Sequence, residues 1–292
     1  MGVPVAGNIL FSDAPDDESP ADVAPAATRS FAVVTVGVVL LAVALSAAIS
    51  VDVVRDGYGI KSDEATYVAM ALSVAYDHDL AYERRDLERF TGLYRSGPNG
   101  IFLKRGKQLK IRFRSRPPFV QLLKSPDPRN DRLYYAKAIL YPIVAAPFVR
   151  LLGLNGLLVM NVLLMAVVCV CGYQFLAARS PALPSMLFTL AFVGATCVPV
   201  YLAMLAPEIL NFALVFVAYF LWLYKEVAPE TRWRFLRSWG SDGVAAVLLG
   251  AATYSKPSHA LLIVPIVLWS WWRRRFVRGL VVGVICVAAA SA

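Results

Sequence analysis

The stretch Ser62-Asp63-Glu64-Ala65-Thr66-Tyr67, which continues through residues 68–72 to Asp77-His78-Asp79-Leu80, follows the first long apolar run of the chain. Its pattern predicts an amphipathic helix that opens with two adjacent carboxylates, and Ser62 is in position to cap that helix. The backbone N–H groups at a helix N-terminus favour the charged form of an acid. Asp63 and Glu64 are therefore either first-turn acids that only help the helix to start, or candidates for a general base close to a membrane.

The composition is that of a membrane protein rather than of a soluble globular domain. Of the 292 residues, 58% are hydrophobic and 17% are charged, and several apolar runs reach the roughly 20 residues that a bilayer-spanning helix requires. The first of these runs covers residues 31–51. We interpret it as an uncleaved transmembrane helix, because it is long for a signal peptide and follows an acidic tail. Residues 1–29, rich in Pro and Ala, are expected to form a disordered cytoplasmic tail.

Residues 30–292 are expected to form one all-α, polytopic membrane domain. After a long polar connection at residues 52–135, the apolar segment at 138–152 is short and contains two prolines, so we expect that it does not cross the membrane. Further apolar runs cover residues 154–178, 182–205, 209–224, 243–254 and 260–272, and a last one begins at Leu280. Because this last run offers only about 13 residues, we expect the chain to be either the N-terminal part of a longer enzyme or a truncated gene product.

The connection at residues 52–135 contains a predicted β-hairpin. Residues 101–103 and 109–114 flank Arg105-Gly106, and the second of these runs alternates apolar and basic residues. Alternation with a period of two on either side of a glycine-containing pair is typical of two strands joined by a turn. We therefore expect a small hairpin in an otherwise helical protein.

A strongly basic run covers residues 95–132, where eleven Lys and Arg stand against two Asp. The run is either a solvated face near anionic lipid headgroups or a cradle for a phosphate, to which Arg112 and Arg114 would contribute. The remaining basic residues lie mainly in short loops between apolar runs. The net charge of +9 therefore indicates membrane topology and contact with the lipid bilayer, rather than binding of nucleic acid.

No metal site and no cofactor are expected from the sequence. The chain has two His residues, and its four Cys residues all fall within apolar runs without metal-ligand spacing. Cysteines in such positions usually behave as small, buried apolar residues. The sequence also lacks a Gly-rich phosphate-binding motif.

The basic loops predict which side of the membrane carries the chemistry. Short loops rich in Lys and Arg stay in the cytoplasm, and the two clearest are residues 225–242 and 273–279. With both loops inside, the connection at residues 52–135 lies outside. Ionisable residues at membrane depth are costly and usually functional. Those that converge on this outer face are Asp63, Glu64, Lys137, Glu208 and Lys256.

The order of several short motifs is familiar. Asp63-Glu64-x-x-Tyr67 and Asp77-x-Asp79-Leu80 follow the first membrane helix, and Tyr135-Ala136-Lys137 then leads to Tyr141-Pro142. Glu208 marks the second external turn, and Lys256-Pro257 follows a segment rich in Gly and Ala. Over residues 31–272 this pattern resembles the GT-C superfamily of polytopic membrane glycosyltransferases, in particular the branch with protein O-mannosyltransferases and lipid A aminoarabinose transferases. One departure is Lys137-Ala138-Ile139, where relatives often have Lys-Pro-Pro or His-Pro-Pro.

The resemblance implies a GT-C-like transmembrane helix bundle with juxtamembrane helices, in a bacterial plasma membrane with the active site outside. It implies an inverting transfer of a sugar from a polyprenyl-phosphate donor to a glycan, lipid or protein acceptor. Asp63 takes the role of the base, with Glu64 beside it, and Glu208 helps to place the acceptor or the base. Lys137 meets the donor phosphate, and the other residues expected to contact substrate are Tyr67, Arg112, Arg114 and Lys256.

Two other readings of the sequence remain open. In a transporter or flippase-like protein, buried acids and lysines would line a substrate path at the midplane of the bilayer. In a non-catalytic scaffold, the convergence of acids and lysines would be accidental. A lateral cleft in which Asp63 faces Lys137 at the outer surface favours the glycosyltransferase.

Overall fold

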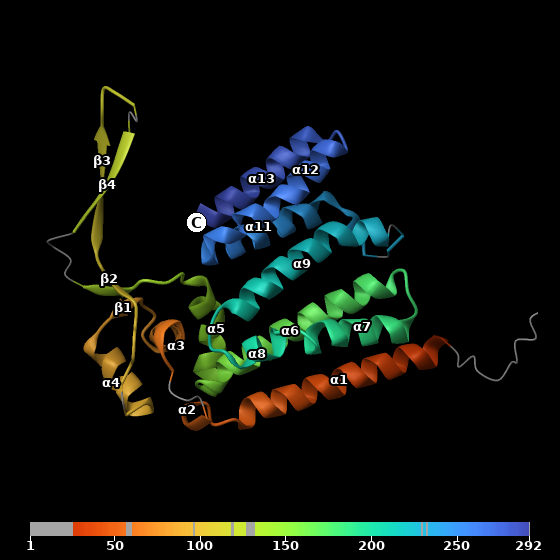
Figure 1. The fold of residues 1–292 in the computed structure, drawn as a ribbon, viewed down its shortest axis with the longest axis horizontal. Helices are drawn as coiled ribbons and strands as arrows, with labels where there is room; N and C mark the ends of the chain where they lie inside the picture. The colour runs from red at the N-terminus through yellow and green to blue at the C-terminus, as the bar shows by residue number, and fades with distance from the viewer. Residues whose placement is uncertain are drawn as a thin grey trace, which may run out of the picture.

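The computed structural model describes residues 26–56, 60–95, 97–117, 120–126, 132–228, 230–231 and 233–291. The described chain is mainly helical, as predicted, and most of its helices lie side by side, with a smaller region of strands and short helices at one end (Figure 1). The helices packed side by side are α1 (Ala26–Ser50), α5 (Leu140–Leu152), α6 (Asn155–Ala177), α7 (Ala182–Gly194), α8 (Val198–Ala203), α9 (Glu208–Val227), α10 (Arg234–Arg237), α11 (Trp239–Ser255), the 3₁₀ helix η1 (Pro257–Ile263), α12 (Val264–Trp272) and α13 (Phe276–Ser291).

Three helices in the described part of the chain are long and apolar enough to cross a membrane. They are α1 over Phe31–Ser50, α6 and α9. The first of them starts earlier than predicted, because α1 begins at Ala26 and so includes residues 26–29 of the expected tail. Residues 1–25 of that tail lie outside the described residues.

The end of α1 is tied to the start of α6 by Asn155. The side-chain Nδ2 of Asn155 donates hydrogen bonds of 2.7–3.0 Å to the carbonyl oxygens of Ala48, Ile49 and Val51. Carbonyl groups at the C-terminal end of a helix have no partner within the helix and need one from elsewhere. Asn155 therefore satisfies the end of α1 and makes α1 and α6 antiparallel neighbours.

One of the predicted apolar runs is interrupted, and another ends where it was predicted to end. The run expected at residues 182–205 forms two helices, α7 and α8, with a turn at residues 195–197 between them. After α11, Lys256 is extended, with φ −138° and ψ 108°, and η1 begins at Pro257. Proline disfavours a helical conformation of the residue before it and lacks an N–H, so α11 stops at Ser255. The last helix, α13, begins at Phe276 rather than at Leu280.

Helix α5 leads the chain from the strand region back into the bundle. It has 13 residues with Pro147 inside it, and it packs against α3 (Ser62–Tyr76) and α6. A helix of this length spans roughly 20 Å, which is short of a hydrocarbon core of about 30 Å. The turn into α6 is tight, because a Cβ on Gly156 would lie 2.2 Å from the carbonyl oxygen of Phe148. Only glycine fits at that position.

The strands pair differently from the predicted hairpin. The short strands β1 (Ala81–Tyr82), β5 (Leu133–Tyr135) and β2 (Leu103–Arg105) form an antiparallel sheet in that order, and β3 (Lys107–Phe113) pairs with β4 (Val120–Pro126). The expected pairing of residues 101–103 with 109–114 is therefore wrong. A two-residue hairpin turn needs positive φ angles, and Gly106 is not among the residues with positive φ. The chain continues straight from β2 into β3 instead of turning back.

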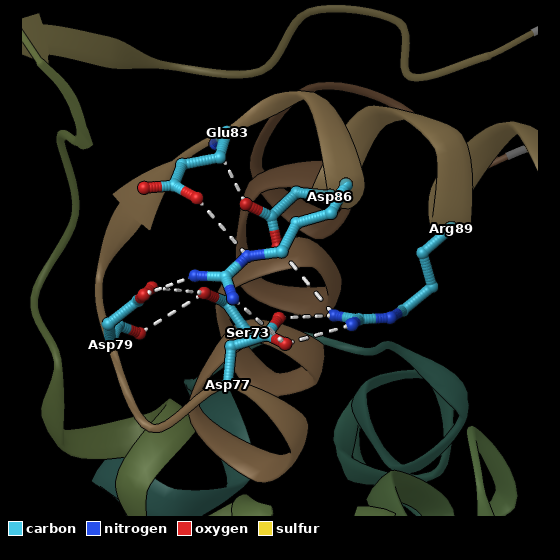
Figure 2. A network of polar contacts seen from close by, with 7 residues as sticks. Ser73, Asp77, Asp79, Glu83, Asp86 and Arg89 are labelled. Carbon is cyan, nitrogen blue, oxygen red and sulfur yellow. Dashed lines mark hydrogen bonds and ion pairs between the residues drawn. The ribbon is translucent and has the colours of Figure 1, made fainter.

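A network of ion pairs fixes α3 against α4 (Arg84–Leu93), the helix that follows it (Figure 2). The guanidinium of Arg89 donates two hydrogen bonds, of 2.6 and 3.0 Å, to the carboxylate of Asp77 at the end of α3. Arg85 pairs with Asp79 at 2.6 Å, and Ser73 donates to the same Asp79 side chain at 3.1 Å. The start of α4 is closed by a capping box in which Glu83 and Asp86 take part. The carboxylates after α3 therefore hold the fold together around α4.

The Asp77–Arg89 pair makes a testable contribution to stability. Replacing Arg89 by Ala should lower the free energy of unfolding by about 1–3 kcal/mol, because Asp77 is largely buried and loses two charge-assisted hydrogen bonds. The hydrogen bonds from Arg89 hold the pKa of Asp77 below its usual value. Their stabilising effect is therefore present above the ordinary pKa of Asp and is lost as the pH falls through the lowered pKa. Thermal unfolding in detergent as a function of pH measures both effects.

Arg84→Ala is the matched control, because the Arg84–Glu88 pair lies on the same helix and is exposed. Its loss should change stability by less than about 0.5 kcal/mol. Equal destabilisation by the two substitutions would contradict the importance of the Asp77–Arg89 pair.

Candidate active-site cleft

A cleft of about 670 Å³ opens where α3, the segment after β5 and the end of α11 meet. It lies at the end of the bundle that carries the strands (Figure 1). The residues that line it come from four separate parts of the chain: Asp63, Tyr67, Lys104, Ala136, Lys137, Ala138, Tyr254, Ser255, Lys256, Pro257 and Ser258. The structure thus brings together residues that the sequence places up to 195 positions apart.

Asp63 and Lys137 face each other in this cleft. The Nζ atom of Lys137 lies 2.7 Å from Oδ1 of Asp63, and the Asp63 side chain is 55% exposed. Lys137 also lies over the ring of Phe102, at 4.5 Å from the ring centroid, which adds a cation–π contact. The backbone N–H of Ala136 donates to the carbonyl of Phe102, so the strand pairing continues to the residue before Lys137. Lys137 is therefore held by the sheet and Asp63 by the first turn of α3.

The start of α3 is fixed by the loop of residues 97–102 rather than by a serine cap. Lys61 occupies the N-cap position without a side-chain cap, and Ser62, predicted as the cap, has a left-handed φ of +56°. A serine caps a helix from an extended conformation outside it, so the predicted cap is wrong. Instead, the N–H of Ser62 donates to the Asn99 carbonyl, and the Thr66 hydroxyl accepts from the N–H of Phe102 at 3.0 Å.

A second carboxylate–lysine pair joins α9 to the end of α11. Nζ of Lys256 lies 2.8 Å from Oε1 of Glu208, the first residue of α9. Both side chains are partly exposed. The extended backbone at Lys256, imposed by Pro257, brings this lysine into the cleft beside Ser255 and Ser258. Glu208 is not among the residues that line the cleft, and it is connected to the cleft through its pair with Lys256.

Tyr67 lies on the cleft wall one turn after Asp63. Its ring packs edge-on against Tyr141 of α5, with 5.6 Å between the ring centroids. Burial, together with the negative charges of Asp63 and Glu208, raises the pKa of Tyr67 to about 12. The phenol therefore stays protonated at physiological pH and remains a hydrogen-bond donor.

Glu64 does not face the cleft. Its Oε1 accepts a hydrogen bond of 3.0 Å from the backbone N–H of Leu205, in the turn before α9, and Glu64 is not among the residues that line the cleft. The two adjacent acids of α3 thus point to different partners. Asp63 is available to a substrate, while Glu64 links α3 to the segment that carries Glu208.

Arg112 and Arg114, expected to hold a donor phosphate, lie elsewhere. Arg112 is in β3 and Arg114 follows it, both are exposed, and neither lines the cleft. The basic residue of this region that does line the cleft is Lys104 in β2. The basic run in the sequence offered no sign that this lysine alone would reach the site, because its position depends on the pairing of β2 with β5.

Within the described residues, no group of three or more His, Cys, Asp or Glu side chains is arranged to hold a metal ion. The ionisable side chains that line the cleft are the carboxylate of Asp63, three lysines and the protonated phenol of Tyr67, and Glu208 adds a second carboxylate through its pair with Lys256. Comparison of the chain with protein-family models, with curated proteins and with solved structures gives no match.

Proposed function

We propose that this chain is an inverting glycosyltransferase that moves a sugar from a polyprenyl-phosphate donor to an acceptor hydroxyl at the non-cytoplasmic face of a bacterial plasma membrane. The observation that carries the proposal is the pairing of Asp63 with Lys137 in a cleft that Lys256 also lines, at the end of helices long enough to span a bilayer. A carboxylate and several ammonium groups are what transfer from a lipid phosphate requires. The proposal agrees with the resemblance of the sequence to GT-C glycosyltransferases.

The donor phosphate is proposed to bind Lys137 and Lys256. The bond between the anomeric carbon and the phosphate oxygen breaks, and negative charge grows on the phosphate as it leaves. Ammonium groups that are already in place stabilise this charge without reorganisation. Lys104, at the lip of the same cleft, is exposed and adds a third positive charge.

Asp63 is proposed to act as the general base. The acceptor hydroxyl attacks the anomeric carbon from the face opposite to the phosphate, its proton passes to Asp63, and polyprenyl phosphate leaves. One displacement of this kind inverts the anomeric configuration. General-base assistance by a positioned carboxylate is worth about 10²–10⁴ in rate.

The ion pair between Asp63 and Lys137 implies that the donor binds before Asp63 becomes free to act as the base. Before the donor binds, the ammonium group of Lys137 contacts the carboxylate of Asp63 at 2.7 Å and occupies it. A donor phosphate competes with Asp63 for the same ammonium group. The base is therefore released only when a leaving group is in place, which limits wasteful reactions with water.

Glu208 and Tyr67 are proposed to position the acceptor. Oε1 of Glu208 is held by Lys256, whereas its Oε2 has no hydrogen-bond partner in the described part of the chain. The protonated phenol of Tyr67 is close enough to this carboxylate and to Asp63 for both negative charges to act on it. A carboxylate and a phenol can together accept from and donate to sugar hydroxyls.

A transporter is the second candidate, and the position of the charges argues against it. Transport sites lie near the midplane of the bilayer, whereas Glu208 is the first residue of α9, a helix of 20 residues that is long enough to cross the bilayer. Glu208 thus lies at the end of a candidate span rather than at its middle.

The proposal is tested by following both products of the donor, the transferred sugar and the released polyprenyl phosphate. Purified protein in vesicles is given polyprenyl-phosphate sugars that are radiolabelled in the sugar, together with cell-envelope glycan, lipid or peptide acceptors. We expect labelled product and release of unglycosylated polyprenyl phosphate in equal amounts, with inverted anomeric configuration. Movement of intact donor between the leaflets, without release of polyprenyl phosphate, would contradict the proposal and favour the transporter.

A further inference from the structure

We propose that five exposed basic residues in and directly after strands β2 and β3 bind an extended polyanion, such as an acidic glycan, whose end enters the cleft as the acceptor. The binding itself is independent of the chemistry, whereas the role of this polymer as acceptor rests on the proposed function. We call these residues the basic arm: Lys104 in β2, Lys107 and Arg112 in β3, and Arg114 and Arg116 after it.

The residues of the basic arm form no ion pairs within the described part of the chain, in contrast to the arginines of α4. In α4, Arg84, Arg85 and Arg89 each pair with a carboxylate (Figure 2 shows the network around Arg89). The five residues of the basic arm are exposed, and none of them forms an ion pair with another described residue. Two charged patches that look alike in the sequence are therefore opposite in character, since one is neutralised internally and the other is open to a partner.

The basic arm starts at the cleft and leads away from it. Lys104 lines the cleft, and β3 follows β2 after a single residue, Gly106. The seven residues of β3 span roughly 23 Å at about 3.3 Å per residue. A donor phosphate or pyrophosphate is too small to reach along this length. The basic arm therefore fits a ligand that carries several anionic groups along an extended chain.

The position of the basic arm fits a polymer that continues from the cleft. In Figure 1, β3 and β4 stand apart from the helices at the end of the bundle where α11 and α13 end, and they run across the direction of these helices. Among the described residues, the extensive contacts of β3 are with β4. Charges spaced along strands that are held away from the helices are open to a long anionic chain. Such a chain, with its end beside Lys104 in the cleft, would follow the strands.

The test uses a binding measurement that needs no turnover. The protein is held in zwitterionic lipid nanodiscs and titrated with a sulfated decasaccharide, with neutral dextran of equal length as the comparison. We expect salt-dependent binding of the sulfated probe only, because each neutralised anion releases a counterion. A variant with Lys107, Arg112, Arg114 and Arg116 all changed to Gln should bind at least tenfold more weakly, with a shallower dependence on salt.

The matched control removes four charges elsewhere. Arg84, Arg273, Arg274 and Arg275 are changed to Gln, which lowers the net charge equally but leaves the basic arm intact. Binding should stay within about twofold of the wild type, since contacts beyond a screening length contribute little. Equal loss in both variants, or no loss in the basic-arm variant, would overturn the proposal.

Two further measurements are needed. One distinguishes a site for a polymer from a contact with the membrane, and the other distinguishes the polyanion site from the proposed reaction. Vesicles of anionic lipid that bind through the basic arm, when the sulfated decasaccharide does not, would overturn the polymer in favour of a membrane contact. In the Asp63→Asn protein, which lacks the proposed base, the four basic-arm substitutions should still weaken decasaccharide binding at least tenfold. Binding that is retained in a protein without transferase activity would sustain the polyanion site and reject only the proposed reaction. Unchanged thermal unfolding of the basic-arm variant verifies that it is folded.

Discussion

Replacing Asp63 by Asn is expected to lower the turnover of a polyprenyl-phosphate sugar by about 10²–10⁴-fold. The amide keeps the shape of the carboxylate and cannot accept the proton of the attacking hydroxyl. Asp63 is 55% exposed and its ion pair with Lys137 lies at the cleft surface, so thermal unfolding should change by less than about 1 kcal/mol. Single-turnover transfer with saturating donor measures the chemical step.

Glu64→Gln is the matched control for this experiment. Glu64 is the next residue of the same helix turn, and its Oε1 accepts from the N–H of Leu205, a contact that the carbonyl oxygen of Gln retains. Turnover of the Gln variant should therefore stay within about tenfold of the wild type. Near-normal transfer by the Asp63 variant would exclude it as the base. A larger loss in the Glu64 variant would exchange the two roles.

The helical parts of the fold were largely predictable because apolar runs report directly on helices. The runs at residues 154–178 and 209–224 correspond to α6 and α9 within a few residues. The run at residues 182–205 gave no sign of its division, because the turn at residues 195–197 is made of residues as apolar as the helices beside it. The strand pairing could not be predicted either. The partner of β2 is β5, about 30 residues away, and hydrophobic alternation does not encode a partner at that distance.

The candidate site was predicted in its residues better than in its contacts. The topology rule placed Asp63, Lys137, Glu208 and Lys256 on one face, and the structure brings them into two ion pairs at one cleft. The rule could not separate Asp63 from Glu64, because which of two adjacent side chains faces a cleft depends on packing against α9. It also could not distinguish the paired arginines of α4 from the unpaired basic arm.

Replacing Lys137 by Ala is expected to weaken the binding of polyprenyl phosphate by about 10- to 100-fold. A charge-assisted hydrogen bond contributes about 1.5–3 kcal/mol, and Lys137 is only 24% exposed, which limits competition from water. Lys256→Ala should have a smaller effect, because Lys256 is 41% exposed. Lys137→Arg should retain part of the affinity, since a planar guanidinium and a compact ammonium group bind phosphate differently.

Arg150→Ala is the matched control, since it also removes one cation from a segment next to α3. The Arg150 guanidinium lies over the ring of Tyr76, at 5.1 Å from the ring centroid, and does not line the cleft. Its loss should leave polyprenyl-phosphate affinity within about twofold of the wild type. An unchanged affinity of the Lys137→Ala protein would make Lys137 a residue that only extends toward lipid headgroups.

The most direct test of the central claim, that Lys137 exchanges Asp63 for the donor phosphate, is a calorimetric titration of polyprenyl phosphate into the Asp63→Asn protein. Removing the competing carboxylate frees an ion pair worth about 0.2–1 kcal/mol. The affinity should therefore rise about 1.4- to fivefold, opposite in direction to the loss in Lys137→Ala. An affinity that stays the same or falls in Asp63→Asn would contradict the account, because Asp63 and the phosphate would then not share Lys137.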